Sequence, residues 1–154
     1  MKDPEALDVS KRGMSETHHP RRILRSIGAV LAGVLAVIIL SVGTDAVLHG
    51  TGIFPPWSER MADALFLVAT AYRSAYAVVG SYIVARLAPD RPMQHALVLG
   101  VVGLTLSIAG AVVTWTAGPE LGPRWYPLAL IATALPCAWV GGKLREVQLS
   151  VENR

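Results

Sequence analysis

Long apolar stretches that are nearly free of charge recur four times along this chain. The only charged residue inside any of them is Arg73, which lies at the centre of the second stretch. The apolar core of a bilayer is about 30 Å thick and needs roughly 20 helical residues to cross it. Each stretch therefore has the length that predicts a membrane-spanning helix. The stretches lie at residues 26–44, 64–85, 92–119 and 125–142.

In lipid, only helices and closed barrels satisfy every backbone hydrogen bond. Barrel strands alternate apolar and polar residues, whereas these stretches are uniformly apolar. We therefore predict an all-α, polytopic membrane protein whose four transmembrane helices form an up-down-up-down bundle. The transmembrane domain would occupy residues 23–142, between a flexible tail at 1–22 and a second tail at 143–154. The predicted helices lie at about residues 23–48, 59–87, 93–116 and 124–140.

Glycine and proline mark the predicted ends of these helices. The connections GTGIFPPW and AGPELGP are rich in both residues, which break helices. Ser58 is the expected N-cap of the second helix. Pro136 falls inside the fourth helix, where it is expected to produce a kink. Gly141 and Gly142 are expected to end that helix.

Small residues recur at spacings that let helix backbones approach closely. In the first helix they are Gly28, Ala32 and Ala36, with Ala29 and Gly33 beside them. In the third helix they are Gly100, Gly103, Ser107 and Gly110. Such rows predict helix contacts within the bundle or between protomers.

The distribution of basic residues predicts the orientation. If both ends face the cytoplasm, that side carries eleven Lys and Arg residues, and the outer side carries only Arg60 and Arg124. Cytoplasmic loops are enriched in basic residues, so we predict that both termini are cytoplasmic. The net charge of +3 is explained by these topogenic residues, and no nucleic-acid partner is expected. The single cysteine, Cys137, excludes an intramolecular disulfide.

Arg73 is the main candidate for a functional residue. An arginine at the centre of a membrane helix costs about 2.5–3.5 kcal/mol on insertion scales, so a partner or a hydrated cavity should compensate it. Its helix carries a stripe of polar and small residues opposite an apolar face, with Tyr72 and Tyr76 flanking the stripe. The stripe should face the bundle interior or a cavity.

Three further polar residues lie near the outer ends of the first two helices: Asp45, His49 and Asp63. We expect them to form an outward-opening vestibule with Arg73. A direct pair with Asp45 requires Arg73 to extend outward or the outer half of the bundle to be hydrated. The pair would serve either helix packing alone or binding and transport. A metal site at these residues is the weaker interpretation, because no second histidine lies nearby, so no metal and no cofactor are expected.

The residues do not form a known catalytic signature. Nucleophilic triads, phosphate loops, dinucleotide fingerprints and the HExxH motif are all absent from the sequence. We therefore expect the protein not to be an enzyme.

Several stretches resemble small four-helix bacterial inner-membrane proteins without a known activity. They are SVGTDAVLHGTGIFPPW, AYRSAYAVVGSYIVARLAPDRPM, GPRWYP and ALPCAWVGGKL, and the resemblance covers about residues 25–145. It implies a multi-pass protein of the inner membrane. The size and helix number are also similar to small multidrug transporters, but the first helix here lacks their glutamate.

Two functions follow as expectations. The first is a multi-pass membrane protein that acts through helix–helix interactions, with itself as a homo-oligomer or with a larger membrane partner. The alternative is a small transporter or channel component with a polar intramembrane site around Arg73. The lipid bilayer is the partner common to both.

Overall fold

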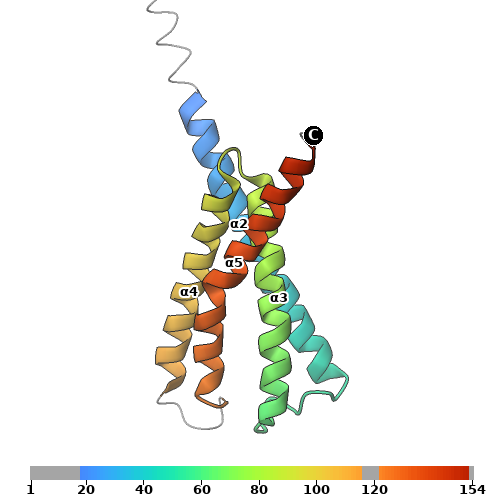
Figure 1. Cartoon of the computed structure of the whole chain (residues 1–154). Helices are drawn as coiled ribbons and strands as arrows, with labels where there is room; N and C mark the ends of the chain where they lie inside the picture. Colours follow the sequence, from blue (N-terminus) through green and yellow to red (C-terminus); the bar gives the residue numbers. More distant parts are fainter. Residues whose placement is uncertain (1–17, 116–121, 153–154) are drawn as a thin grey trace, which may run out of the picture.

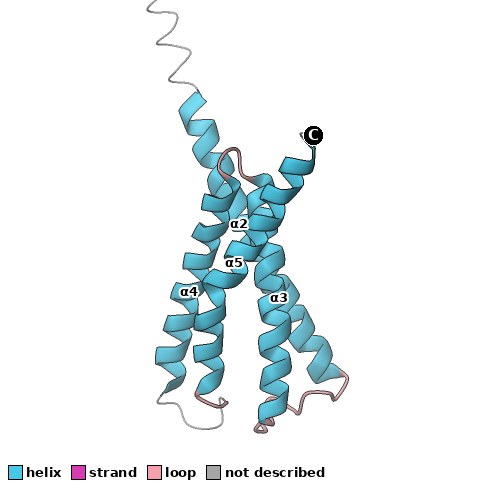
Figure 2. Cartoon of the chain, in the orientation of Figure 1, coloured by secondary structure: helices cyan, strands magenta, loops and turns pink. Residues whose placement is uncertain are grey.

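The computed structural model describes residues 18–115 and 122–152, and four helices dominate them (Figure 1). Helix α2 spans His18–Gly50, α3 spans Asp63–Leu87, α4 spans Pro92–Trp115 and α5 spans Trp125–Glu152. Figure 2 shows only helices and loops in this part of the chain, which confirms the predicted all-α class. Of the flexible tail predicted at residues 1–22, residues 1–17 lie outside the described residues, and residues 18–22 belong to α2.

Large apolar side chains cover the outer faces of these helices. On α4, for example, the exposed fractions of Val112 and Val113 are 68% and 71%, and on α2 that of Ile39 is 66%. Monomeric soluble proteins rarely expose contiguous apolar surface of this kind. All four helices are long and apolar enough to cross a membrane.

The first three helices lie close to their predicted positions, but the start of α3 differs. Ser58 was predicted as its N-cap, and this prediction was wrong: the N-cap is Ala62, which makes no side-chain capping bond. The connection between α2 and α3 is instead held by the packing and backbone hydrogen bond of Phe54. Phe54 is buried, and its N–H donates to the Leu48 carbonyl at 2.9 Å. Asp63 then occupies the first turn, where a negative charge favours the helix dipole.

The end of α5 also differs from the prediction. The helix was expected to end at Gly141 and Gly142, yet it continues through both residues to Glu152. The reason is packing: a Cβ atom on Gly141 would lie 2.5 Å from the Val78 carbonyl oxygen and 2.7 Å from Ser81 Cβ. The missing side chain therefore lets α5 cross α3 closely, and glycine here marks a helix contact instead of a helix end.

The helices alternate in direction, and consecutive helices are neighbours, as the up-down-up-down prediction requires (Figure 1). Their order around the bundle is α2, α3, α5, α4, because α5 packs between α3 and α4 and α2 packs mainly on α3. Both ends of the described chain lie at one end of the bundle, here named the terminal end. The opposite end, where α2 stops and α3 and α5 begin, is named the hairpin end.

The core consists mainly of small residues. A Cβ atom on Gly33 of α2 would lie 2.9 Å from the Gly80 carbonyl oxygen of α3, and one on Gly100 of α4 would lie 2.6 Å from Ala138 Cβ of α5. The helices cross closely through these contacts and separate toward the hairpin end (Figure 1). The small-residue rows are therefore used only in part, because Cβ atoms on Gly28, Gly103 and Gly110 would meet nothing within 4 Å.

Candidate functional site

Asp45 of α2 and Arg73 of α3 form a direct ion pair. Arg73 Nη2 donates to Asp45 Oδ2 at 2.6 Å, and the hydroxyl of Tyr72 donates to Asp45 Oδ1. The exposed fractions of the Asp45 and Arg73 side chains are 17% and 34%. Both carboxylate oxygens are therefore engaged, and the guanidinium has its counter-charge within the bundle.

Helix geometry explains how residues at different depths meet. Arg73 lies ten residues after the start of α3, about 15 Å along its axis, and Asp45 lies five residues before the end of α2, about 7.5 Å. Side chains on a helix lean toward its N-terminus. The Arg73 side chain therefore leans toward the hairpin end, and that of Asp45 leans away from it. Because the helices are antiparallel, the two side chains converge.

A second polar contact joins α2 and α3 one turn deeper in the bundle. The hydroxyls of Thr44 and Tyr76 lie 2.8 Å apart and share a hydrogen bond. Tyr72 and Tyr76 thus both reach across to α2, from consecutive turns of α3. Both tyrosines were among the residues predicted for the site, whereas Thr44 was not, because a threonine in an apolar helix commonly bonds its own backbone.

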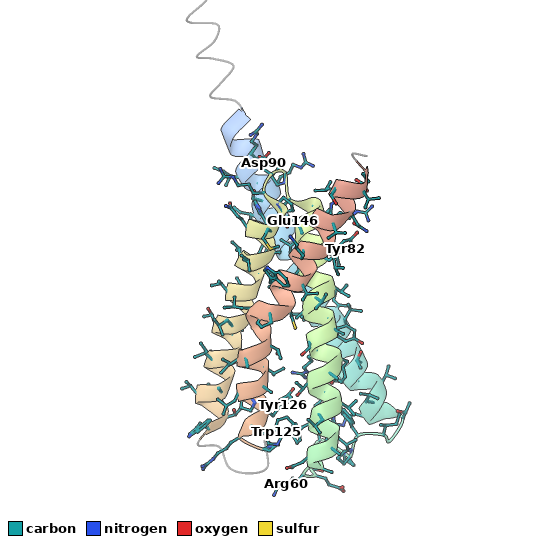
Figure 3. The ribbon with its side chains drawn as sticks, in the orientation of Figure 1. Arg60, Tyr82, Asp90, Trp125, Tyr126 and Glu146 are labelled. Atoms are coloured by element: carbon teal, nitrogen blue, oxygen red, sulfur yellow. The ribbon has the colours of Figure 1, made fainter. Side chains whose placement is uncertain are left out.

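A third helix contributes Tyr126, which was not among the residues predicted for the site. The Arg73 guanidinium carbon lies 6.0 Å from the centroid of the Tyr126 ring, within the range of a cation–π contact. The Phe66 ring lies on the other side, 5.1 Å from Tyr126 between centroids. Figure 3 shows Tyr126 at the hairpin end of α5, on the side that faces α3. Arg73 therefore contacts α2 and α5 at once.

His49 anchors the connection between α2 and α3. Its Nδ1 donates to the Pro55 carbonyl at 2.6 Å, and its ring stacks on Trp57 with centroids 3.7 Å apart. Asp63 is exposed in the first turn of α3. Of the predicted vestibule, the structure thus joins Asp45 to Arg73 directly, places His49 against the α2–α3 connection and leaves Asp63 exposed at the start of α3. Within residues 18–115 and 122–152, no three His, Cys, Asp or Glu side chains are placed to hold a metal ion.

Two cavities meet at Arg73. The larger, about 520 Å³, lies toward the hairpin end between α3, α4 and α5, and we name it the arginine cavity. The smaller, about 250 Å³, lies beside the connection between α2 and α3, and Asp45 and His49 line it. Arg73 and Tyr126 line both cavities and form the wall between them. Asp63 lines neither of the two.

The arginine cavity carries positive charge. Its lining includes Arg60, Arg73 and Arg124, and the described lining residues include no Asp or Glu. Arg124 lies over the ring of Trp115, with 5.6 Å between the guanidinium carbon and the ring centroid. Figure 3 places Arg60 at the hairpin end, next to the start of α3. Three arginines from different parts of the chain therefore line one space.

The rim of this cavity depends on a glycine. Gly122 has a φ of 107°, a left-handed conformation that L side chains rarely adopt. A Cβ atom there would lie 2.5 Å from Cζ of the Phe66 ring. This close approach holds the chain that leads to Arg124 and Tyr126 against α3.

Comparisons with family models, with curated proteins and with solved structures give no match to this chain. The functional conclusion therefore depends on the geometry of the site itself.

Proposed function

We propose that this protein spans the bacterial inner membrane four times, with both termini in the cytoplasm. The exposed apolar faces of the four helices support insertion, since lipid is the solvent in which such faces are stable. The common location of both described chain ends and the excess of basic residues at that end support the orientation. The hairpin end is then the outer end, and the arginine cavity lies in the outer half of the membrane.

Within this frame, the protein is a ligand-binding or transport component whose site is the arginine cavity. The observation that carries the proposal is the convergence of Arg60, Arg73 and Arg124 on a space of about 520 Å³. Drug-sized ligands occupy sites of roughly 300–1,000 Å³. Of these three arginines, only Arg73 has a carboxylate partner among the described residues. An anionic ligand would supply the missing negative charge.

The polar side chains around Arg73 are arranged for binding a ligand and not for catalysis. Around Arg73, the polar side chains bond one another: Tyr72 and Arg73 both donate to Asp45, and Tyr76 bonds Thr44. These bonds fix the position of the guanidinium instead of preparing a nucleophile or base. A preorganised cation of this kind attracts and orients an anion, so we propose a non-enzymatic role.

The experiment is an anion titration of the full-length protein in nanodiscs of zwitterionic lipid. Phenyl phosphate is the probe, and binding is followed by calorimetry. We expect saturable binding that weakens about tenfold in Arg73→Gln, which corresponds to about 1.4 kcal/mol. Arg73→Lys, which keeps the charge, should recover part of the affinity.

The matched control is Arg25→Gln, which removes the same charge from an exposed position at the terminal end. It should bind phenyl phosphate as the unmodified protein does. An equal loss in this control, or no saturable binding in the unmodified protein, would refute the proposal.

A second candidate function is association with another copy or with a larger membrane partner. One observation favours it: Gly28 and Gly43 on α2 are exposed, and Cβ atoms there would meet nothing within 4 Å. Small residues on a free helix face allow a second helix to approach closely. Light scattering in mild detergent tests self-association. A dimer in the unmodified protein that becomes a monomer in Gly43→Leu is the supporting result.

A further inference from the structure

The arginine cavity combines two kinds of lining, and this combination indicates the class of its ligand. Cationic side chains lie at the hairpin end, where Arg60 precedes α3 and Arg124 precedes α5. Apolar side chains lie deeper: Leu106 of α4 is nine residues before Trp115, about 13.5 Å along the helix axis. Leu130 of α5 is also deeper than Arg124. A ligand that fills this space therefore has a charged end and an apolar body.

The rim has the chemistry of a phosphate site. Guanidinium groups present a planar fork of donors that matches phosphate oxygens, and Arg is favoured wherever such pairing is needed. Arg124 lies over the Trp115 ring, a contact that positions the guanidinium and leaves its N–H donors available. Arg73, deeper in the cavity, is already bonded to Asp45. The two rim arginines are therefore the better holders of an anionic group.

The size of the cavity and its apolar wall limit the rest of the ligand. A space of about 520 Å³ holds a headgroup and the first part of a chain, but not a complete two-chain lipid. Leu106 lines the cavity, and its exposed fraction is 61%. The wall formed by α4, a helix apolar enough to cross a membrane, thus presents exposed apolar surface at the depth of Leu106. An acyl chain can follow this surface from the cavity into the bilayer.

We infer that the arginine cavity binds an anionic amphiphile, whose phosphate group lies between Arg60 and Arg124 and whose chain passes Leu106 and Leu130. This inference rests on the proposed function and specifies its ligand class. Because the cavity lies toward the outer end, the phosphate lies at the level of the outer headgroups. A membrane lipid with an exposed phosphate has both the anionic group and the acyl chain, and its phosphate lies at this level.

Native mass spectrometry of the full-length protein in mild detergent tests this inference. The probes are dimyristoyl phosphatidic acid, dimyristoyl phosphatidylcholine and inorganic phosphate. We expect phosphatidic acid to bind at least about tenfold more tightly than phosphatidylcholine, a difference of about 1.4 kcal/mol. The double variant Arg60→Gln/Arg124→Gln should lose this preference, and Arg60→Lys/Arg124→Lys should keep most of it.

The control is Arg25→Gln/Arg86→Gln, which removes two exposed charges at the terminal end and should keep the preference. Equal binding of the two lipids, or a preference that survives in Arg60→Gln/Arg124→Gln, would overturn the inference. Binding of inorganic phosphate without any binding of phosphatidic acid would also overturn it, and would assign the site to a free anion. Failure of this inference can be distinguished from failure of the proposed function. The proposed function is tested by a different readout, the Arg73-dependent binding of phenyl phosphate in a zwitterionic bilayer.

Discussion

At the scale of single residues, the arginine in an apolar helix was the informative signal. Its charge required compensation, and the two carboxylates near the outer helix ends were the obvious candidates. Asp63 lies ten residues before Arg73 on the same helix, about 15 Å along its axis, so Asp45 was the candidate for a direct pair. Whether that pair forms depends on which faces of α2 and α3 meet, and the sequence does not define that. Tyr126 was also unpredictable, because α5 lies beside α3 only through the glycine contacts of the bundle.

Removal of the Asp45 charge should change the affinity for an anion and the thermal stability of the protein in opposite directions. Asp45→Asn leaves Arg73 without its counter-charge, so the affinity for phenyl phosphate should rise about tenfold while the melting temperature falls. Anion titration and thermal unfolding of the same sample measure both effects. A purely structural ion pair predicts the loss of stability without any gain in affinity.

The pair itself should contribute little net stability. Loss of one partner of a buried pair costs about 3–5 kcal/mol, and we expect about 2 kcal/mol for Asp45→Leu because this pair is only partly buried. The double variant Asp45→Leu/Arg73→Leu removes both charges and should unfold near the temperature of the unmodified protein. Thermal unfolding in detergent measures this, and a double variant less stable than Asp45→Leu would contradict it.

At the scale of helices, the hydrophobic pattern predicted the number, type and approximate position of all four elements. The errors came from residues with two possible roles. Glycine ends many helices, but in an apolar bundle it also allows helices to touch, and only the position of the neighbouring helix decides between these roles. Gly141 was misinterpreted for that reason, and Ser58 because the buried Phe54 holds the preceding loop.

The contact at Gly141 should be sensitive to a single added side chain. Gly141→Val places atoms against the backbone of α3, and overpacking of this kind costs about 1–3 kcal/mol. Gly103→Ala is the matched control, because its Cβ atom meets nothing within 4 Å and alanine favours a helix by about 0.5–1 kcal/mol. The melting temperature should fall in the first variant and stay level or rise in the second. Similar falls in both would contradict the packing role.

At the scale of the whole molecule, the bundle has a closely packed terminal half and an open hairpin half. Small residues let the helices approach where they cross, and the helices separate toward the end that holds the arginine cavity (Figure 1). This shape was not predictable from the sequence, since it depends on the order of helices around the bundle. The excess of basic residues at the terminal end predicts which half faces the cytoplasm.

Reporter fusions test this orientation. Alkaline phosphatase is active outside the cytoplasm, and a fluorescent protein that folds in the cytoplasm reports the other side. We expect the fluorescent reporter to be active after residue 152 and after Arg91, and the phosphatase to be active after Trp57. Phosphatase activity at the C-terminal fusion would contradict the predicted topology.

The most direct test of the central claim is the accessibility of the arginine cavity from outside the cell. In a Cys137→Ala background, Ser107→Cys places a thiol in the cavity, about 12 Å from the hairpin end of α4, and Val112→Cys places one on the exposed apolar face. A membrane-impermeant sulfonate reagent added to intact cells should label position 107 and spare position 112. A thiol at position 107 that stays unlabelled from outside, or reacts only from the cytoplasmic side, would contradict an outward-opening cavity.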